Sequence, residues 1–312
     1  MSAAQGIGIG ERQAEDRTPP DDDDEARPVG RRRATPYLLL LPGMAWLAVF
    51  FIIPLLTLLS TSTQTRPEGA EIGVYTQTFR LANYPDAISE YFEVFVRSFT
   101  YALIATVLAL AISYPLAYAI AFKSGRLRNI LLVLVVAPFF VSFLLRTVAW
   151  KQILADNSWV LDALRWLHLL SEDGRIINTP LAVVIGITYN FLPFMILPIY
   201  ASLERVDPRL MEAAGDLYAN GLTTLRKVTF PLSMPGVVAG TLLTFIPAAG
   251  DYVNATLLGD PVRTTMVGNV IDSRFLRVVD YPTAAVLSVT LMVSILVLVA
   301  VYIRRAGTEE LV

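Results

Sequence analysis

The sequence predicts an all-α polytopic membrane protein with six transmembrane helices. Of its 312 residues, 54% are hydrophobic and only 17% are charged, whereas soluble domains have about 45–50% and about 25%. The mean hydropathy is +0.55, and the apolar residues gather into runs of roughly 20, the length that crosses a bilayer as a helix. Such runs are too long for the core of an ordinary soluble protein.

The first apolar run follows three arginines, Arg31 to Arg33, and extends for about 25 residues, beyond the 7–15 of a signal-peptide core. We therefore expect an uncleaved first transmembrane helix over 36–62. The segment before it, 1–35, contains an acidic run and almost no large apolar residue, which predicts a disordered cytoplasmic tail.

Five more runs meet the same length criterion. The predicted spans are 98–122, 130–148, 181–203, 232–249 and 283–303, with an outer loop over 63–92 and a short cytoplasmic tail over 306–312. In the fifth span, Gly236 and Gly240 are four residues apart, a spacing that suits close helix packing in lipid. An equally open interpretation is that these glycines only fill space.

The distribution of Lys and Arg predicts the orientation of the spans. Two very short segments at the ends of spans, 123–128 and Arg304-Arg305, are basic and nearly free of acidic residues. We therefore expect both termini on the cytoplasmic side. In the outer loop over 149–180, apolar and charged residues between Trp159 and Leu170 mix as in a helix lying at the membrane interface, and His168 is expected to be an ordinary interfacial residue.

The residue inventory excludes most catalytic chemistry. The chain has no Cys and a single His, which argues against disulfides, thiolate nucleophiles and His-rich zinc sites. Its net charge of −2 leaves no broad basic surface for nucleic acid. No phosphate-binding loop or nucleophile motif is present. We therefore expect neither an enzyme nor a cofactor site in this chain.

The loop between the fourth and fifth spans has an unusual pattern. Asp207 can cap a helix that has Pro208 at its first position, and Asn220-Gly221 is expected to end that helix before a second one begins. One face of the first helix is apolar, with Leu210, Ala213, Ala214 and Leu217. This face suits either a groove on a partner protein or the membrane surface.

This loop resembles a known family motif. Glu212-Ala213-Ala214, followed by 228–231 (Val-Thr-Phe-Pro), is similar to the E-A-A loop of bacterial ABC-importer permeases, E-A-A-x3-G-x9-I-x-L-P, and departs from it at Tyr218, where the family usually has Gly. Four other sequence segments are similar to the first permease subunit of spermidine/putrescine importers: 143–150, 189–195, 246–253 and 257–259. The resemblance covers about 37–305.

The resemblance implies a type I ABC-importer permease core of five helices over 93–305, with a cytoplasmic coupling loop at 204–231, in a bacterial cytoplasmic (inner) membrane. It also implies a second homologous permease, two ATPase subunits that bind ATP and Mg²⁺, and an extracytoplasmic substrate-binding protein. Five residues would sit in a groove of the ATPase: Glu212, Ala213, Ala214, Gly215 and Asp216.

Two charged residues near the ends of spans are candidates for the substrate pathway, because an unpaired charge costs ~2.5–3.5 kcal/mol at mid-membrane by the lower estimates. They are Arg146 and Asp251. Asp251 follows Pro247 and Gly250, where a broken helix can line a water-filled cavity. It can equally be a solvated helix-end residue or a partner for Arg146.

A polyamine cation would need such a carboxylate, and Tyr252 or Trp150 can add cation–π contact. Tyr189 and Asn190 in the fourth span are polar candidates for the pathway lining, or partners in interhelical hydrogen bonds.

Other functions remain open at this point. Related permeases carry opines, aminoalkylphosphonates, thiamine or ferric ion, and a single Asp does not exclude these solutes. An ion-coupled secondary carrier and a membrane enzyme are disfavoured, because few acidic or His residues lie within the spans and no nucleophile–base set appears. A purely structural scaffold is disfavoured by the prolines inside several spans.

Overall fold

The computed structural model describes residues 35–306, so the predicted tails at 1–35 and 306–312 lie outside these residues except for their innermost positions. The chain divides into two compact units, Met1–Ile53 and Pro54–Val312. In the first, helix α1 (Thr35–Leu47) runs into the π-helical segment η1 (Ala48–Ile52). With α2 (Ile53–Ser62) these segments make up the first predicted span.

The second unit is helical apart from one short antiparallel pair, β1 (Gln64–Thr65) with β2 (Thr76–Gln77). Its segments after these strands are α3 (Asn83–Phe122), η2 (Gly125–Leu127), α4 (Arg128–Val136), η3 (Ala137–Phe140), α5 (Phe143–Ile153), α6 (Trp159–Trp166), α7 (Pro180–Glu204), α8 (Pro208–Asp216), α9 (Gly221–Thr224), η4 (Leu225–Thr229), α10 (Phe230–Leu232), α11 (Met234–Ala249), α12 (Val253–Leu258), α13 (Val267–Leu276) and α14 (Tyr281–Ala306).

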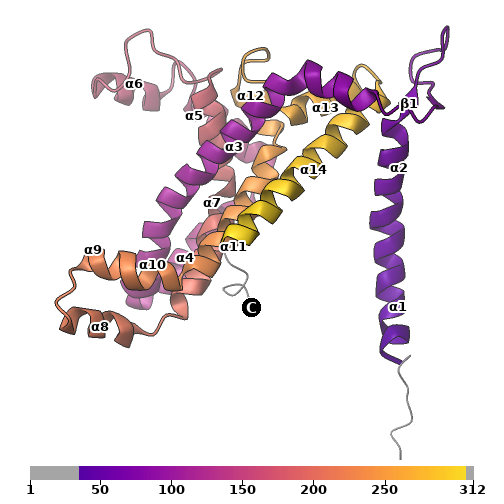
Figure 1. Ribbon diagram of the computed structural model, residues 1–312. Helices are drawn as coiled ribbons and strands as arrows, with labels where there is room; N and C mark the ends of the chain where they lie inside the picture. Colours follow the sequence, from indigo (N-terminus) through magenta and orange to yellow (C-terminus); the bar gives the residue numbers. More distant parts are fainter. Residues whose placement is uncertain (1–34, 307–312) are drawn as a thin grey trace, which may run out of the picture. The chain divides into compact units, whose positions relative to one another are not determined.

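The core of this unit is the packing of α3, α7 and α11, with α14 against α3 and α13 (Figure 1). Alanines form the contact face of α3, because small side chains allow helices to approach closely where no hydrophobic effect drives them together. Ala102, Ala105, Ala109 and Ala117 are fully buried there. Figure 1 places α8, α9 and α10 at one end of the bundle and α6, α12 and α13 at the other.

Gly236 and Gly240 lie where α11 packs against α7. A Cβ added to Gly236 would come within 2.4 Å of the Pro198 carbonyl oxygen, and one on Gly240 within 3.0 Å of the Met195 carbonyl oxygen. The two glycines therefore form the close-packing face that their spacing predicted. The interpretation that they only fill space is wrong.

Two of the six predicted spans are bent, a feature that the sequence prediction did not include. Within residues 35–306, four helices are long and apolar enough to cross a membrane, and the number reaches six if each of two bent pairs is one span. The third span bends by 96° between η3 and α5, after Pro138, and the fifth by 69° at Ser233, between α10 and α11. A proline interrupts the helical hydrogen bonds beside each bend.

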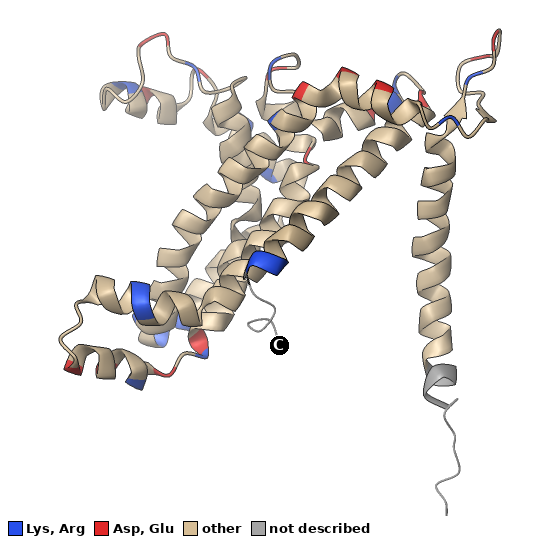
Figure 2. Ribbon diagram, in the orientation of Figure 1, with Lys and Arg blue, Asp and Glu red and all other residues tan. Residues whose placement is uncertain are grey.

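The second span is longer than predicted. Helix α3 has 40 residues and begins at Asn83, inside the expected outer loop. Its first turns carry Asp86, Glu90, Glu93 and Arg97, which lowered the hydropathy there without interrupting the helix. Figure 2 shows this separation, with charged residues gathered toward the helix ends and long uncharged stretches in α3 and α14.

The packing at Gly236 makes a stability prediction. Gly236→Ala is expected to lower the free energy of unfolding of the detergent-purified chain by about 1–3 kcal/mol, because the new methyl group meets backbone atoms of α7 that cannot move alone. Thermal denaturation measures the change. Gly221→Ala is the matched control, since no atom lies within 4 Å of a Cβ there. Equal stability of both variants would contradict the packing role.

Candidate functional site

Residues 204–231, which run from the last residue of α7 into α10, are called the coupling segment below. Its first helix forms as the sequence predicts: the Asp207 carboxylate accepts a hydrogen bond from the backbone N–H of Arg209 (2.9 Å), and Pro208 begins α8. Asn220 caps α9 in the same way, its side-chain oxygen accepting from the N–H of Thr223 (2.8 Å). Local capping therefore determines where both helices start.

The coupling segment presents α8 to its surroundings. No residue of α8 is buried, and Leu217 just after it is 82% exposed. Glu212, Ala213, Gly215 and Asp216 are exposed and Ala214 is half-buried. A Cβ on Gly215 would meet no atom within 4 Å. The five predicted coupling residues thus lie on one short helix at the end of the bundle opposite α12 and α13 (Figure 1).

Tyr218 stands at the tip of this segment with a positive φ of 58° and a side chain that is 99% exposed. That left-handed conformation is the one glycine adopts without cost, which explains why the family pattern has Gly at this position. The turn after α8 is therefore made here by a tyrosine in a glycine-like backbone conformation.

A buried polar network lies toward the other end of the bundle. Asp251, 7% exposed, accepts two hydrogen bonds from Asn254, one from its backbone N–H and one from its side-chain amide, both 2.8 Å. The side-chain oxygen of Asn254 in turn accepts from the Asn190 amide (3.0 Å) and the Thr147 hydroxyl (3.4 Å). The network therefore joins α5, α7, α12 and the turn that precedes α12.

Two of the predicted pathway residues, Asp251 and Asn190, meet in this network, while Asn254 and Thr147 were not predicted. A sequence signal existed for Asn254, because an Asp three residues before it can cap a helix through its backbone N–H. Gly186 allows the approach: a Cβ there would lie 2.6 Å from the Asn254 side-chain oxygen.

Burial raises the pKa of Asp251 from 3.8 to about 6, and the hydrogen bonds from Asn254 and Val253 act in the opposite direction. Asp251 lies in the turn after α11, outside the spans. The interpretation of Asp251 as a solvated helix-end residue is therefore wrong, since its carboxyl group is buried and both of its oxygens accept hydrogen bonds.

The aromatic candidates fall into two groups. The rings of Trp150 and Tyr189 form an edge-to-face pair with centroids 5.2 Å apart, which links α5 to α7 next to the polar network. Tyr252 lies outside the network and is 46% exposed. Its backbone carbonyl accepts a hydrogen bond from the Asn269 amide (2.9 Å).

Arg146 does not pair with Asp251. It is 9% exposed, its guanidinium carbon lies 5.0 Å from the ring centroid of Phe139 and 5.7 Å from that of Phe143, and no ion pair forms between it and a described carboxylate. The suggested Arg146–Asp251 pair is therefore absent from the described part of the chain.

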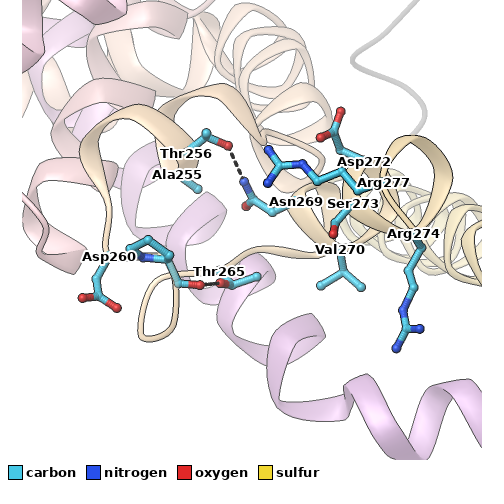
Figure 3. Close-up of a pocket in the computed structure, with 11 residues that line it drawn as sticks. Ala255, Thr256, Asp260, Thr265, Asn269, Val270, Asp272, Ser273, Arg274 and Arg277 are labelled. Carbon is cyan, nitrogen blue, oxygen red and sulfur yellow. Dashed lines mark hydrogen bonds between the residues drawn. The ribbon is translucent and has the colours of Figure 1, made fainter. Parts of the chain in front are cut away.

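A polar pocket of about 350 Å³ opens beside α12 and α13 (Figure 3). The side chains of Thr256 and Asn269 meet across it through a hydrogen bond of 2.7 Å. Two carboxylates and two guanidinium groups line it, from Asp260, Asp272, Arg274 and Arg277. Because these charges balance, the pocket is less suited to a polycation than to a protein surface of mixed charge. Within residues 35–306, no three metal-ligating side chains gather.

Comparisons with known proteins agree with this geometry. The family described as the binding-protein-dependent transport system inner membrane component matches residues 113–306. The chain is 37% identical over 269 residues to the spermidine/putrescine transport system permease protein PotB of Escherichia coli strain K12, covering 86% of this chain and 96% of the relative. It is 39% identical over 261 residues to the Haemophilus influenzae protein of the same name, covering 83% and 90%.

A solved structure gives the same fold. The crystal structure of a bacterial ABC transporter involved in the import of the acidic polysaccharide alginate contains a chain with a TM-score of 0.60 and 18% sequence identity, covering 86% of this chain and 94% of that one. At this identity the likeness concerns the fold alone.

The buried carboxyl group of Asp251 makes a pH prediction. Because folding raises its pKa from 3.8 to about 6, the ionised group opposes folding above about pH 6, and this cost disappears as the pH falls toward about 4. The free energy of unfolding of Asp251→Asn, relative to the wild type, is therefore expected to rise by about 2 kcal/mol from pH 4 to pH 7. Denaturation in detergent at several pH values measures it.

Asp260→Asn is the matched control with the opposite sign. Backbone N–H groups of Arg263 and Val262 lower the pKa of Asp260, so its carboxylate stabilises the folded chain at neutral pH and this contribution is lost as the pH falls through its lowered pKa. A relative stability of Asp251→Asn that does not change with pH would contradict the buried, ionisable state of Asp251.

Proposed function

This chain belongs to the family of inner membrane components of binding-protein-dependent transport systems, and on that basis we propose that it forms half of the translocation pathway of a polyamine importer. The family makes it a multi-pass inner membrane permease of an ABC importer and not an enzyme. Nucleotide binds to the ATPase of such an importer, and a separate binding protein delivers the solute. The proposal adds spermidine or putrescine as the solute and a second homologous permease as the other half.

The observation that carries the polyamine assignment is the similarity, over most of the chain, to permeases named for spermidine and putrescine transport. The site chemistry supports it. Asp251 supplies a buried carboxylate, and the Trp150 and Tyr189 rings next to the network offer π faces to a desolvated ammonium group. We assign Asp251, Asn190, Tyr189 and Trp150 to the pathway, with Tyr252 nearer its extracytoplasmic opening. Arg146, which the sequence also suggested, lies in an apolar cavity and is not assigned to the pathway of a cation.

The ATPase coupling role belongs to α8. None of its residues is buried, so its surface is available to a partner, and the E-A-A motif lies on it. We propose that residues 212–216 dock into the ATPase, two copies of which serve the permease pair. The basic residues beside the coupling segment and at the end of α14 favour the cytoplasm for this end of the bundle, which would place both termini there.

The proposed solute is tested by uptake. Cells lacking this chain are expected to lose uptake of labelled spermidine or putrescine, and Asp251→Asn is expected to reduce it at least about tenfold, because a desolvated ammonium group loses its counter-charge. Asp162→Asn, on the exposed side of α6, keeps the same chemistry outside the pathway and is expected to behave as the wild type. Unchanged uptake in the deletion strain would overturn the polyamine assignment.

The coupling role has its own prediction. Gly215→Trp is expected to leave the chain folded, because the space around Gly215 is open, and yet to abolish uptake by blocking the ATPase surface. Glu212→Ala is expected to weaken ATPase binding. Co-purification of the ATPase with the tagged permease, together with the ratio of ATP hydrolysed to solute transported, measures both. Normal transport by both variants would remove α8 from the coupling role.

A further inference from the structure

Arg146 lies in an apolar cavity of about 280 Å³ at the bend between η3 and α5. Its Nε and Nη1 atoms are buried and have no hydrogen-bond partner among the described residues. Apolar residues from α3, α4 and α7 form the other walls, among them Leu134, Leu192 and Ile196. Leu134 is 61% exposed, so the cavity opens at the surface of the isolated chain.

The cavity lies near the middle of the membrane. The α7 residues that line it, from Tyr189 to Ile196, occupy the centre of a 25-residue helix. A guanidinium group at this depth is among the most expensive groups to leave unpaired. The aromatic rings of Phe139 and Phe143 attract it, but they offer no acceptor to its in-plane N–H groups. The group therefore lacks an acceptor among residues 35–306, and an anion from elsewhere would satisfy it.

The position of the cavity limits which molecules can supply this anion. Phospholipid phosphates lie at the two edges of the roughly 30 Å hydrocarbon core, whereas the α7 residues that line the cavity lie around the centre of a 25-residue helix, so we take a membrane-spanning partner and not a lipid as the source. The proposed solute is a cation and would be repelled. Within residues 35–306, no carboxylate pairs with Arg146. What remains is an acidic side chain on another membrane-spanning helix.

We infer that the Arg146 cavity receives an Asp or Glu from a membrane-spanning helix of the second permease subunit. This inference rests on the proposed function, which supplies the second permease. The apolar walls exclude water from the contact, so the charge-assisted hydrogen bonds form in a low dielectric and favour one register between the two subunits. The contact would also fix the position of α5, whose Thr147 belongs to the polar network within this chain.

The test uses the complete complex purified through a tag on this chain. Arg146→Glu is expected to lower recovery of the second permease at least about tenfold, because it places like charges together in a buried site. Arg146→Lys is expected to retain most of it. Lys151→Glu, an exposed position further along the same helix, is the matched control and is expected to assemble as the wild type.

Two further measurements keep the outcome clear if Arg146→Glu does not fold. A photo-crosslinking residue at Leu134 is expected to capture the second permease, and capture of lipid alone would overturn the inference. In the Arg146→Glu background, replacement of one acidic residue in the partner's spans by Lys is expected to restore assembly. Failure of every such position, or normal assembly of Arg146→Glu, would overturn it.

Recovery of the second permease does not depend on the solute, so this test separates the contact from the proposed function. A wild-type complex without a second permease would overturn both. A complex that contains it but transports no polyamine would overturn only the choice of solute.

Discussion

The close approach of α11 to α7 is the constraint on which the rest of the second unit depends. Helices in lipid gain little from hydrophobic burial against one another, so their association depends on close van der Waals contact and hydrogen bonds. Gly236 and Gly240 allow the α11 backbone to meet that of α7, and Gly186 does the same for α12. With these helices close together, Asn190 reaches Asn254, and the buried carboxylate of Asp251 is satisfied.

Two buried charged groups of the bundle, those of Asp251 and Arg146, have different surroundings. Both carboxylate oxygens of Asp251 accept hydrogen bonds from Asn254 of its own chain, and the proposed cationic solute would add the counter-charge. Arg146 is surrounded by rings and aliphatic side chains, which leave two of its N–H-bearing atoms without acceptors. Asp251 is thus hydrogen-bonded within the chain, whereas Nε and Nη1 of Arg146 have no acceptor among the described residues, which is the basis of the proposed partner contact.

Features decided by neighbouring residues could be predicted from the sequence. The cap at Asp207, the start of α8 at Pro208, the break at Asn220-Gly221 and the first and fourth spans follow from local patterns. The bends of the third and fifth spans could not be predicted, because a proline inside an apolar run does not say whether the helix kinks or breaks. Thr147 was missed because its role arises only when three helices meet, whereas Asn254 had a local signal in the Asp three residues before it.

Helix α7 connects the polar network to the coupling segment. Near its middle, Asn190 donates to the network around Asp251. At the end of α7, where the coupling segment begins, the Tyr200 hydroxyl and the Glu204 carboxylate both bind Arg128, the first residue of α4. Although Pro193 and Pro198 interrupt its hydrogen bonds, α7 remains one helix over 25 residues. A displacement of α8 by a partner would therefore act on α4 and α7 together, and α7 would carry it to the polar network.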